Sequence, residues 1–193
     1  MKKSPNMLMD DEHDEPVVAA VLRGTVPVVH EKSMQDLLRS RGYGEEDGDR
    51  YILRPFEALY LLYKGSLSLK KAGKIIGFDS LMRIYKSEDG GAFTDYLIYR
   101  DLRSRGYMVR KGFGFGSDFL VYERGDFGQK GAKYSVFGFR EGSREKIRNL
   151  QKKIHTMSKM GKEPIIAVIE RRGEIIYYKV STSIFTQNIK KME

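Results

Sequence analysis

The sequence predicts an α+β fold, with a small N-terminal α/β domain over residues 1–90 and a C-terminal mixed-sheet domain over residues 91–193. Three observations support this prediction. Strand-like and helix-like stretches follow one another through the C-terminal half in the order helix, strands, helix, strands. The pair Gly90-Gly91 interrupts the chain between the two halves. The balance of charge changes at nearly the same point.

In the N-terminal half, the first elements are two short strands and a helix. Residues 17–30 are mostly apolar on both sides of an Arg-Gly pair, which predicts two short strands joined by a turn. Residues 32–41 have the pattern of a short helix. We expect Ser33 to cap its start and Gly42 to end it.

A strand followed by further helices is predicted next. Residues 51–65 begin with strand-like residues, and Pro55 suits the first turn of a helix. The apolar face expected for that helix consists of Leu59, Leu62 and Tyr63. Residues 69–89 are expected to form one or two more short helices.

The C-terminal half is predicted to begin with an amphipathic helix over Phe93–Arg105. Thr94 is placed to cap this helix, and Gly106 is placed to stop it. Its expected apolar face is Leu97, Ile98 and Leu102. Strand-like stretches follow at residues 107–112, 117–125 and 133–140.

A basic helix and a hairpin complete the predicted elements. Residues 143–160 have helical spacing and many lysines and arginines. Residues 165–181 predict two strands with a turn at Arg171–Gly173.

Charge and composition narrow the class of protein. Residues 1–94 carry 14 Lys and Arg against 15 Asp and Glu, whereas residues 95–193 carry 21 against 11. An excess of cations in one half suggests a polyanion such as nucleic acid as the partner of that half. The sequence has no apolar run of about 20 residues, so we expect no membrane span. With no cysteine and no signal-like start, we expect a cytoplasmic protein without disulfides.

The segment Tyr99–Gly125 is the most informative part of the sequence. It reads YRDLRSRGYMVRKGFGFGSDFLVYERG and combines cations, glycines and aromatic residues. Cations neutralise phosphates, and flat aromatic faces stack on unpaired bases. This composition predicts contact with RNA. Its GFGFG motif lacks the spacing of a phosphate-binding loop and is expected to let a strand bend.

This segment, followed by KYSVFGF, IHTMSK and IIAVIERRGEIIYY, resembles the archaeal tRNA-splicing (tRNA-intron) endonucleases. The N-terminal half resembles the smaller N-terminal domain of that family. The resemblance implies a tRNA-endonuclease-like C-terminal domain and a metal-independent RNA endonuclease without a cofactor. The substrate implied is precursor tRNA with a bulge-helix-bulge at each intron boundary. The products implied are a 2′,3′-cyclic phosphate and a 5′-hydroxyl.

The family supplies a tyrosine, a histidine and a lysine for this reaction, and the resemblance assigns the tyrosine position to Tyr122. The base removes the 2′-hydroxyl proton, the acid protonates the leaving 5′-oxygen, and a cation stabilises the phosphorane. Arg124, Arg110 and Lys111 are close enough in sequence to favour ionisation of the tyrosine. The histidine position, however, falls on Gly131, which has no proton to donate.

Two other family positions also depart from the pattern or are ambiguous. The family lysine aligns with Lys159 when the match runs forward from His155, and with Lys162 when it runs backward from the last hairpin. We prefer Lys159, because a loop tolerates inserted residues better than a helix does. A base-stacking arginine of the family is replaced by Lys152, which keeps the charge but loses the planar face. The cations expected to contact RNA are Lys152, Arg110, Lys111 and Lys133.

Without the histidine, this chain resembles the structural subunit of a heteromeric enzyme more than a catalytic one. The implied partners are precursor tRNA and a catalytic subunit of the same family, in a hetero- or homo-tetramer. Family members pair their C-terminal strands across a dimer interface. The residues expected there are Ile176, Tyr178, Ile184 and Phe185. Burial of this strand by the protein's own helices is the alternative.

Two other functions stay open. The chain could be a catalytically competent homomeric tRNA-intron endonuclease in which another group, such as Lys133, replaces the histidine. It could also be a metal-dependent, restriction-enzyme-like nuclease that uses Asp118 with a neighbouring carboxylate. The second alternative lacks the expected E-x-K pattern, because Glu123 is followed by Arg124 and Gly125.

Overall fold

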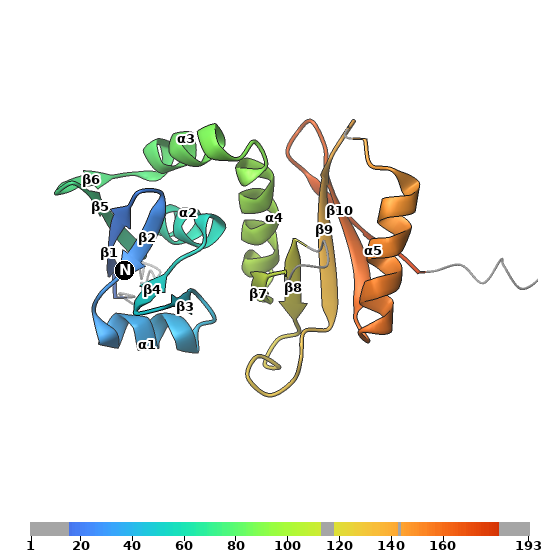
Figure 1. Ribbon diagram of the computed structural model, residues 1–193, viewed down its shortest axis with the longest axis horizontal. Coiled ribbons are helices and arrows are strands. Elements are labelled where there is room, and N and C mark those ends of the chain that lie inside the picture. The colour runs from blue at the N-terminus through green and yellow to red at the C-terminus, as the bar shows by residue number, and fades with distance from the viewer. Residues whose placement is uncertain (1–15, 113–117, 143, 182–193) are drawn as a thin grey trace, which may run out of the picture.

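The computed structural model describes residues 16–112, 118–142 and 144–181, and in these ranges it is a mixed α+β structure with two sheets (Figure 1). The acidic stretch DDEHDE, most of the GFGFG motif, and the predicted interface residues Ile184 and Phe185 lie outside the described residues. The predicted fold class is confirmed.

The N-terminal half forms a sheet in which the strand order is β3-β4-β2-β1-β5-β6. Only β1 and β5 run parallel within it. Its elements are β1 (Val18–Arg23), β2 (Val26–Val29), α1 (Lys32–Ser40), β3 (Glu45–Asp47), β4 (Arg50–Ile52), α2 (Pro55–Tyr63), β5 (Leu67–Lys71), β6 (Lys74–Ile76) and α3 (Phe78–Glu88).

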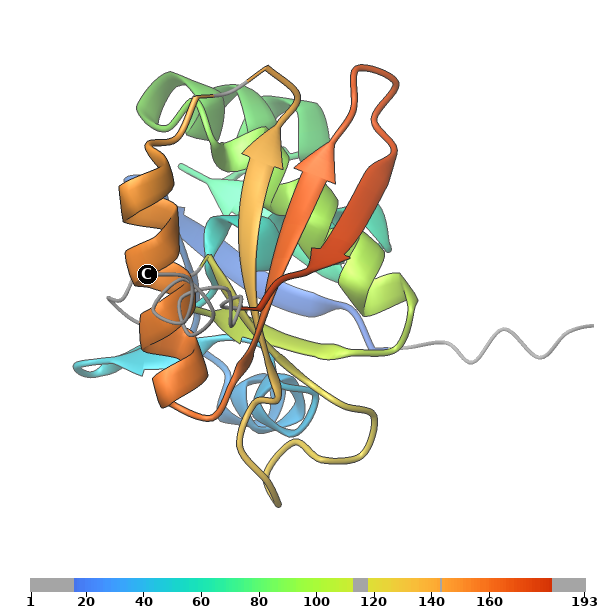
Figure 2. The ribbon, with the colours of Figure 1, turned by 90° about the vertical axis from the view of Figure 1, so that its right-hand side faces the viewer.

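The C-terminal half forms a second sheet in the order β11-β10-β9-β8-β7. Its elements are α4 (Ala92–Ser104), β7 (Met108–Lys111), β8 (Phe119–Tyr122), β9 (Tyr134–Arg140), α5 (Ile147–Lys159), β10 (Glu163–Ile169) and β11 (Ile175–Lys179). Strands β9 and β10 are parallel, and α5 is the crossover that parallel pairing requires. Helix α4 lies on one side of this sheet and α5 on the other (Figures 1 and 2).

The hydrophobic core continues from one half of the chain into the other. Phe56 of α2 contacts Tyr99 of α4 and Phe119 of β8, with ring centroids 4.7 and 5.1 Å apart. Burial of such large rings stabilises the fold strongly. The predicted boundary at Gly90-Gly91 lies in the connection between α3 and α4, and it stays a prediction.

Residues 69–76 correct the sequence analysis, because they form a hairpin where a helix was expected. Leu67 and Leu69 are buried, whereas Lys70 and Lys71 are exposed. This period of two is short, and the basic residues at the turn hide it. The helix expected in the second part of residues 69–89 is present as α3.

The two predicted N-caps are wrong, whereas Gly42 and Gly106 follow the ends of α1 and α4 as expected, with φ of 70° and 84°. Helix α1 begins one residue before Ser33, and Glu31 takes the N-cap position. The Ser33 hydroxyl donates to the Glu31 carboxylate rather than to the helix backbone. Helix α4 begins at Ala92, and the buried Thr94 hydroxyl accepts a hydrogen bond from Arg140 Nε at 2.7 Å.

The predicted apolar face of α2 is wrong in part. Tyr63 is 61% exposed, and Leu62 is only half-buried. The helix is buried over most of its circumference, since Phe56, Ala58 and Leu61 are buried along with Leu59. A helix of this kind lies between layers, which here are the N-terminal sheet and α4, and amphipathic spacing does not describe it.

Candidate active site

Tyr122 lies at the C-terminal end of β8, on the side of the sheet that α5 covers. Phe119 and Val121 point into the core beneath α4, so Leu120 and Tyr122 alternate to the other side. Tyr122 is half-buried, and its ring meets that of Phe127 edge-on with centroids 5.2 Å apart.

Gly131 lies in the connection between β8 and β9, beside the end of β8. A Cβ atom built at Gly131 meets no atom within 4 Å, and the residue is not in the left-handed backbone region. The local structure therefore has room for a side chain. The absence of a histidine here is a property of the sequence and not a requirement of the fold.

Lys133, the nearest candidate to replace the histidine, is held by a carboxylate. Its ammonium Nζ lies 2.6 Å from Glu123 Oε1, and the Tyr134 hydroxyl donates to the same oxygen at 2.8 Å. The hydrogen bond to Glu123 raises the pKa of Lys133 above its ordinary value, and the same contact lowers the pKa of Glu123. A lysine with a raised pKa is a poorer proton donor at neutral pH.

Of the two candidate lysines, Lys162 contacts the connection that carries Gly131. Its ammonium Nζ donates to the Ala132 carbonyl at 3.1 Å, and the neighbouring Glu163 amide donates to the Lys133 carbonyl at 2.8 Å. Lys159 lies exposed in the last turn of α5, and its ammonium makes no hydrogen bond or ion pair with the described part of the chain. The turn between α5 and β10 thus meets the connection at Gly131.

The cations expected to assist Tyr122 have other contacts. The Arg124 guanidinium donates to the Arg105 carbonyl from Nε at 3.1 Å and from Nη2 at 2.5 Å. Lys111 pairs in register with Phe119, at the opposite end of β8 from Tyr122. The contact of Arg124 is thus with the end of α4, and Lys111 lies at the far end of the strand pair.

Arg110 is directed at the N-terminal half of the protein. Its Nη1 donates to the carbonyls of Gly42 and Gly44 at 3.2 and 2.6 Å, and lies 4.0 Å from Glu57 Oε1. The RNA contact predicted for Arg110 remains untested. Its observed contacts join β7 to the turn before β3.

The sequence analysis missed Glu57, which is 2% exposed. Its Oε2 accepts the backbone N–H of Gly44 at 3.1 Å and that of Arg54 at 2.9 Å. Burial raises its pKa to about 7, although the two backbone donors and Arg110 act in the opposite direction. Its place three residues after the N-cap, with a proline at the start of the helix, was the available signal.

Asp118 lies at the start of β8, with Lys111 and Asp95 nearby. Its carboxylate accepts the Gly138 N–H at 2.6 Å. Burial raises the pKa of Asp95 to about 6, and the charge of Asp118 adds to the effect. In the described ranges, no three His, Cys, Asp or Glu side chains group as metal ligands would. The donor set gives the restriction-enzyme-like alternative no support.

Helix α5 presents cations to solvent on its outer side. The cations Arg148, Lys152 and Lys159 are exposed, and the side chain of His155 is exposed between them. Their spacing of three or four residues places them along one face. The helix contains no acidic residue. This is the surface on which the predicted RNA contact at Lys152 lies.

Strand β11 forms one edge of the C-terminal sheet and leaves apolar side chains exposed. Ile176 is 37% and Tyr178 is 51% exposed. Tyr177 points the other way, and its hydroxyl donates to Asp101 Oδ2 at 2.7 Å. In the part of the chain that the structure describes, no helix buries the face that carries Ile176 and Tyr178.

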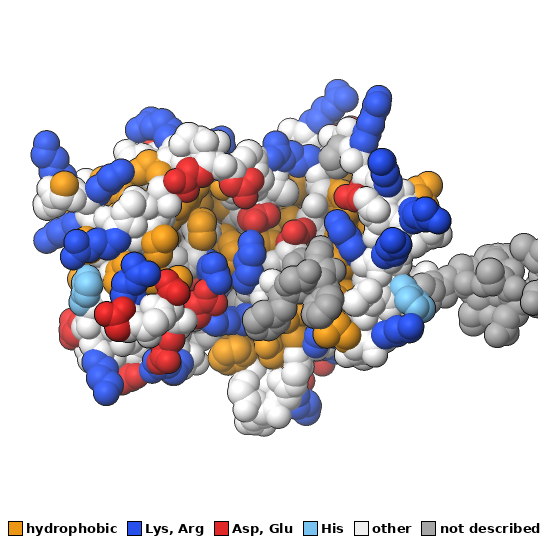
Figure 3. Space-filling view, viewed as in Figure 1, with side chains coloured by type: hydrophobic (Ala, Val, Ile, Leu, Met, Phe, Trp, Pro, Cys, Tyr) orange, Lys and Arg blue, Asp and Glu red, His pale blue; other side chains and the backbone are white. Residues whose placement is uncertain are grey.

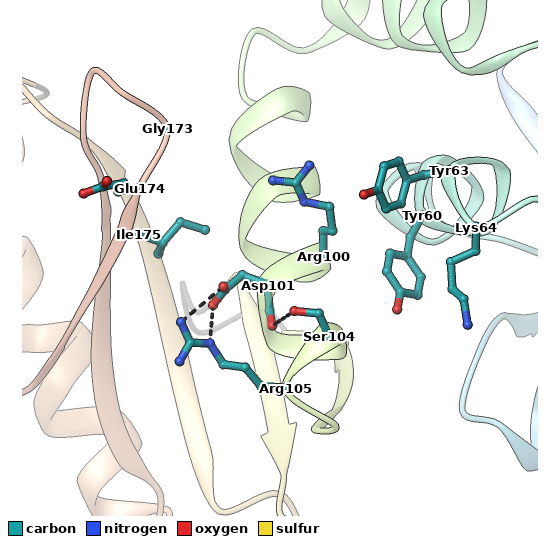
Figure 4. Close-up of a pocket in the computed structure, with 10 residues that line it drawn as sticks. All are labelled: Tyr60, Tyr63, Lys64, Arg100, Asp101, Ser104, Arg105, Gly173, Glu174 and Ile175. Carbon is teal, nitrogen blue, oxygen red and sulfur yellow. Dashed lines mark hydrogen bonds and ion pairs between the residues drawn. The ribbon is translucent and has the colours of Figure 1, made fainter. Parts of the chain in front are cut away.

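A groove of about 630 Å³ lies between α2, α4 and the turn that joins β10 to β11 (Figure 4). Asp101 and Arg105 form an ion pair at 2.7 Å along its floor. The Arg100 guanidinium lies 5.6 Å from the ring of Tyr63 at its rim. None of the predicted catalytic residues lines this groove.

Comparison with protein families matches nearly all of the described chain. The family model for the tRNA intron endonuclease N-terminal domain matches residues 18–82, and that for the tRNA intron endonuclease catalytic C-terminal domain matches residues 93–177. In the described part of the chain, no helix is long and apolar enough to cross a membrane.

Individual relatives agree with the family models. A tRNA-splicing endonuclease of Pyrococcus horikoshii is 34% identical over 153 residues, which is 78% of this chain and 86% of the relative. The tRNA-splicing endonuclease of Methanococcus vannielii is 34% identical over 79% of this chain and 87% of the relative. That of Thermococcus onnurineus is 29% identical over 78% of this chain and 86% of the relative.

Proposed function

This chain belongs to the tRNA intron endonuclease family, and we propose that it is the structural subunit of a heteromeric tRNA-splicing endonuclease. The complex cleaves precursor tRNA at a bulge-helix-bulge and works in the cytoplasm. Its partner is a subunit of the same family that carries the histidine. The two chains form a heterotetramer.

One observation carries this proposal. The position of the family histidine is Gly131, although no atom lies within 4 Å of a Cβ built there and a side chain would fit. In the family reaction the 2′-oxygen attacks phosphorus, the bond to the 5′-oxygen breaks, and an acid protonates that oxygen. General acid catalysis of this kind contributes about 10²–10⁴-fold. Gly131 supplies no proton, and Lys133 is held by Glu123 at 2.6 Å with a raised pKa. Among the described residues, neither Gly131 nor Lys133 is a competent acid beside Tyr122.

The other two catalytic positions are retained but vestigial in this proposal. Tyr122 keeps the position of the base, although Arg124 is engaged by the Arg105 carbonyl. The contact of Lys162 with Ala132 supports the alternative register for the lysine over Lys159. We call the place between Tyr122, Gly131 and Lys162 the corner around Tyr122. A phosphate bound there would meet the Lys162 ammonium and the Tyr122 phenol, but no general acid.

The exposed edge of β11 supports association with a second subunit. An edge strand with apolar side chains invites pairing with another strand. Ile176 and Tyr178 supply such side chains on one face of β11. We propose that this face packs against the equivalent strand of the partner.

A homomeric enzyme is the second candidate function. The relatives, which span nearly the same length, are named as tRNA-splicing endonucleases without reference to a second chain. This candidate requires Lys133 or another group to act as the acid. Disruption of the Glu123 ion pair by bound RNA would be needed first.

Cleavage assays with a bulge-helix-bulge RNA distinguish the two candidates. The purified chain alone should leave the RNA intact, and addition of a histidine-bearing subunit should give cleavage to a 2′,3′-cyclic phosphate. Cleavage by the chain alone would favour the homomeric enzyme. Loss of cleavage with EDTA would favour metal-dependent chemistry over both.

A further inference from the structure

We propose that the β5–β6 hairpin, residues 67–76, is a second RNA-binding surface, which contacts the phosphate backbone of the precursor tRNA outside the cleavage site. This inference rests on the proposed function, because it takes a precursor tRNA as the bound molecule. It assigns a role to the N-terminal half, whose balance of charge does not suggest one.

The hairpin carries a cluster of unpaired cations. Lys70, Lys71 and Lys74 are all exposed, and within the described residues none of their ammonium groups makes an ion pair or a hydrogen bond. Residues 66–78 contain no aspartate or glutamate. Blue side chains gather at the end of the molecule where β5 and β6 lie (Figure 3).

Pairing across the hairpin places like charges opposite one another. Lys71 is the register partner of Lys74. Directly opposed residues of an antiparallel pair have Cβ atoms about 4.5–5.5 Å apart, and like charges there are destabilising. An anion between the two ammonium groups would remove this repulsion. A phosphate group has the charge and the acceptor oxygens for this position.

The other face of the hairpin adds a cation and an apolar contact. Lys70 is paired with Ile75, which is 72% exposed. In the neighbouring parallel strand Lys70 is paired with Val21, and the exposed Arg23 follows two residues later on the same face. Both faces of the hairpin therefore present positive charge.

The turn makes the hairpin a narrow projection. The two residues between Lys71 and Lys74 are Ala72 and Gly73, with φ of 48° and 81°. Positive φ at both positions is the geometry of a type I′ turn, which matches the twist of the strands. Small residues at the tip leave the backbone and the flanking lysines free to approach a phosphate chain.

The hairpin lies at a different end of the molecule from α5 and the corner around Tyr122. β6 and α5 lie at opposite ends of the longest axis (Figure 1). A short RNA bound near Tyr122 and α5 would not extend to β6, whereas a whole precursor tRNA is large enough to do so. The two surfaces can thus be tested with RNAs of different length.

The experiment compares two charge-matched triple variants in the complete complex. One is Lys70→Gln, Lys71→Gln and Lys74→Gln. The control is Lys32→Gln, Arg39→Gln and Arg50→Gln, which removes three exposed cations of α1 and β4 from the same half of the chain. Affinity is measured at several salt concentrations for an intron-containing precursor tRNA and for a short RNA with only the bulge-helix-bulge.

The hairpin variant should bind the precursor tRNA about tenfold more weakly and with a shallower salt dependence, because up to three phosphate contacts are lost. Its affinity for the short RNA should equal that of the unmodified complex. The control should bind both RNAs nearly as the unmodified complex does. Circular dichroism confirms that both variants are folded.

Four results would overturn the proposal. An equal loss on both RNAs would show a general effect of charge. Unchanged RNA affinity combined with a smaller complex, measured by light scattering, would assign the hairpin to a protein contact. A third result is normal binding of precursor tRNA by the hairpin variant, when the unmodified complex binds the short RNA. The hairpin inference would then fail, and the proposed function would stand. Failure of the unmodified complex to bind either RNA would contradict both.

Discussion

The corner around Tyr122 and the β5–β6 hairpin use their cations in opposite ways. At the corner, Lys133 is paired with Glu123, and Arg124 donates to a backbone carbonyl. On the hairpin, Lys70 and Lys74 have no such partner among the described residues. The C-terminal half has the larger excess of positive charge, but cations that can bind a polyanion also lie in the N-terminal half. Hydrogen-bond partners, more than net charge, indicate where a polyanion can bind.

The largest expected effect comes from restoring a histidine at the corner. Gly131→His should give the chain alone measurable cleavage, about 100-fold or more above the background seen with the unmodified chain, because a general acid contributes about 10²–10⁴-fold. The side chain fits, since no atom lies within 4 Å of a Cβ at this position. Gly131→Gln serves as the control of similar size. Equal rates for both variants would show that the missing acid does not limit the reaction.

The Gly131→His background also distinguishes the two lysines. Lys162→Gln should lower the restored cleavage by about tenfold or more, because the lost cation would stabilise the phosphorane. Lys159→Gln should have a smaller effect, since its ammonium has no contact with the connection at Gly131, unlike Lys162. Single-turnover rates measure the difference. The reverse order would support the forward register.

Removing Arg110 should destabilise the protein by about 2–4 kcal/mol, because it leaves the buried Glu57 carboxylate without its cation. Arg110 Nη1 also donates to the Gly44 carbonyl at 2.6 Å. Chemical denaturation of Arg110→Met measures the loss. A change below about 0.5 kcal/mol, the range of an ordinary surface substitution, would contradict this role and return Arg110 to the RNA-contact group.

Glu57 predicts a dependence of stability on pH. The pKa of this carboxyl is raised to about 7 from an ordinary value of 4.5, mainly by burial. The folded state therefore binds more protons than the unfolded state between these values, and the free energy of unfolding falls as pH rises through this window. The expected loss is about 2–3 kcal/mol. Glu57→Gln, which keeps an oxygen for the Gly44 and Arg54 amides, should flatten that part of the curve. An unchanged slope would contradict the assignment.

The smallest effect concerns the tip of the hairpin. Ala72 has φ of 48°, where a Cβ is disfavoured. Ala72→Asn should stabilise the protein by about 0.5–1 kcal/mol, because Asn-Gly is the preferred type I′ pair. Thermal unfolding measures the shift. Destabilisation would show that the turn geometry is different. RNA affinity should not change, since no charge is altered.

The regular elements with long or clear patterns could be predicted from the sequence. Leu97, Ile98 and Leu102 were expected on one face of a helix and are buried in α4. The hairpin of β10 and β11 was expected from its apolar strands and its turn at Gly173. The hairpin at residues 69–76 was not predicted. The alternation of buried and more exposed residues around Leu67 and Leu69 is too short to separate a period of two from helical spacing.

The roles of the candidate site residues stay predictions, but the structure shows contacts at these positions that the sequence could not predict. Tyr122 and Gly131 followed from the family pattern, whereas the ion pair of Lys133 with Glu123 depends on how the chain between β8 and β9 turns. Arg110 shows the same limit. Its partners, Gly42 and Gly44, lie 68 and 66 residues away in sequence, so only the fold reveals them.

The most direct test of the central claim is a cleavage assay with the purified chain, with and without a histidine-bearing subunit, on a bulge-helix-bulge RNA in EDTA. No cleavage by the chain alone, together with cleavage to a 2′,3′-cyclic phosphate by the mixture, is the predicted result. Cleavage by the chain alone, at a rate that Gly131→His does not increase, would contradict the account.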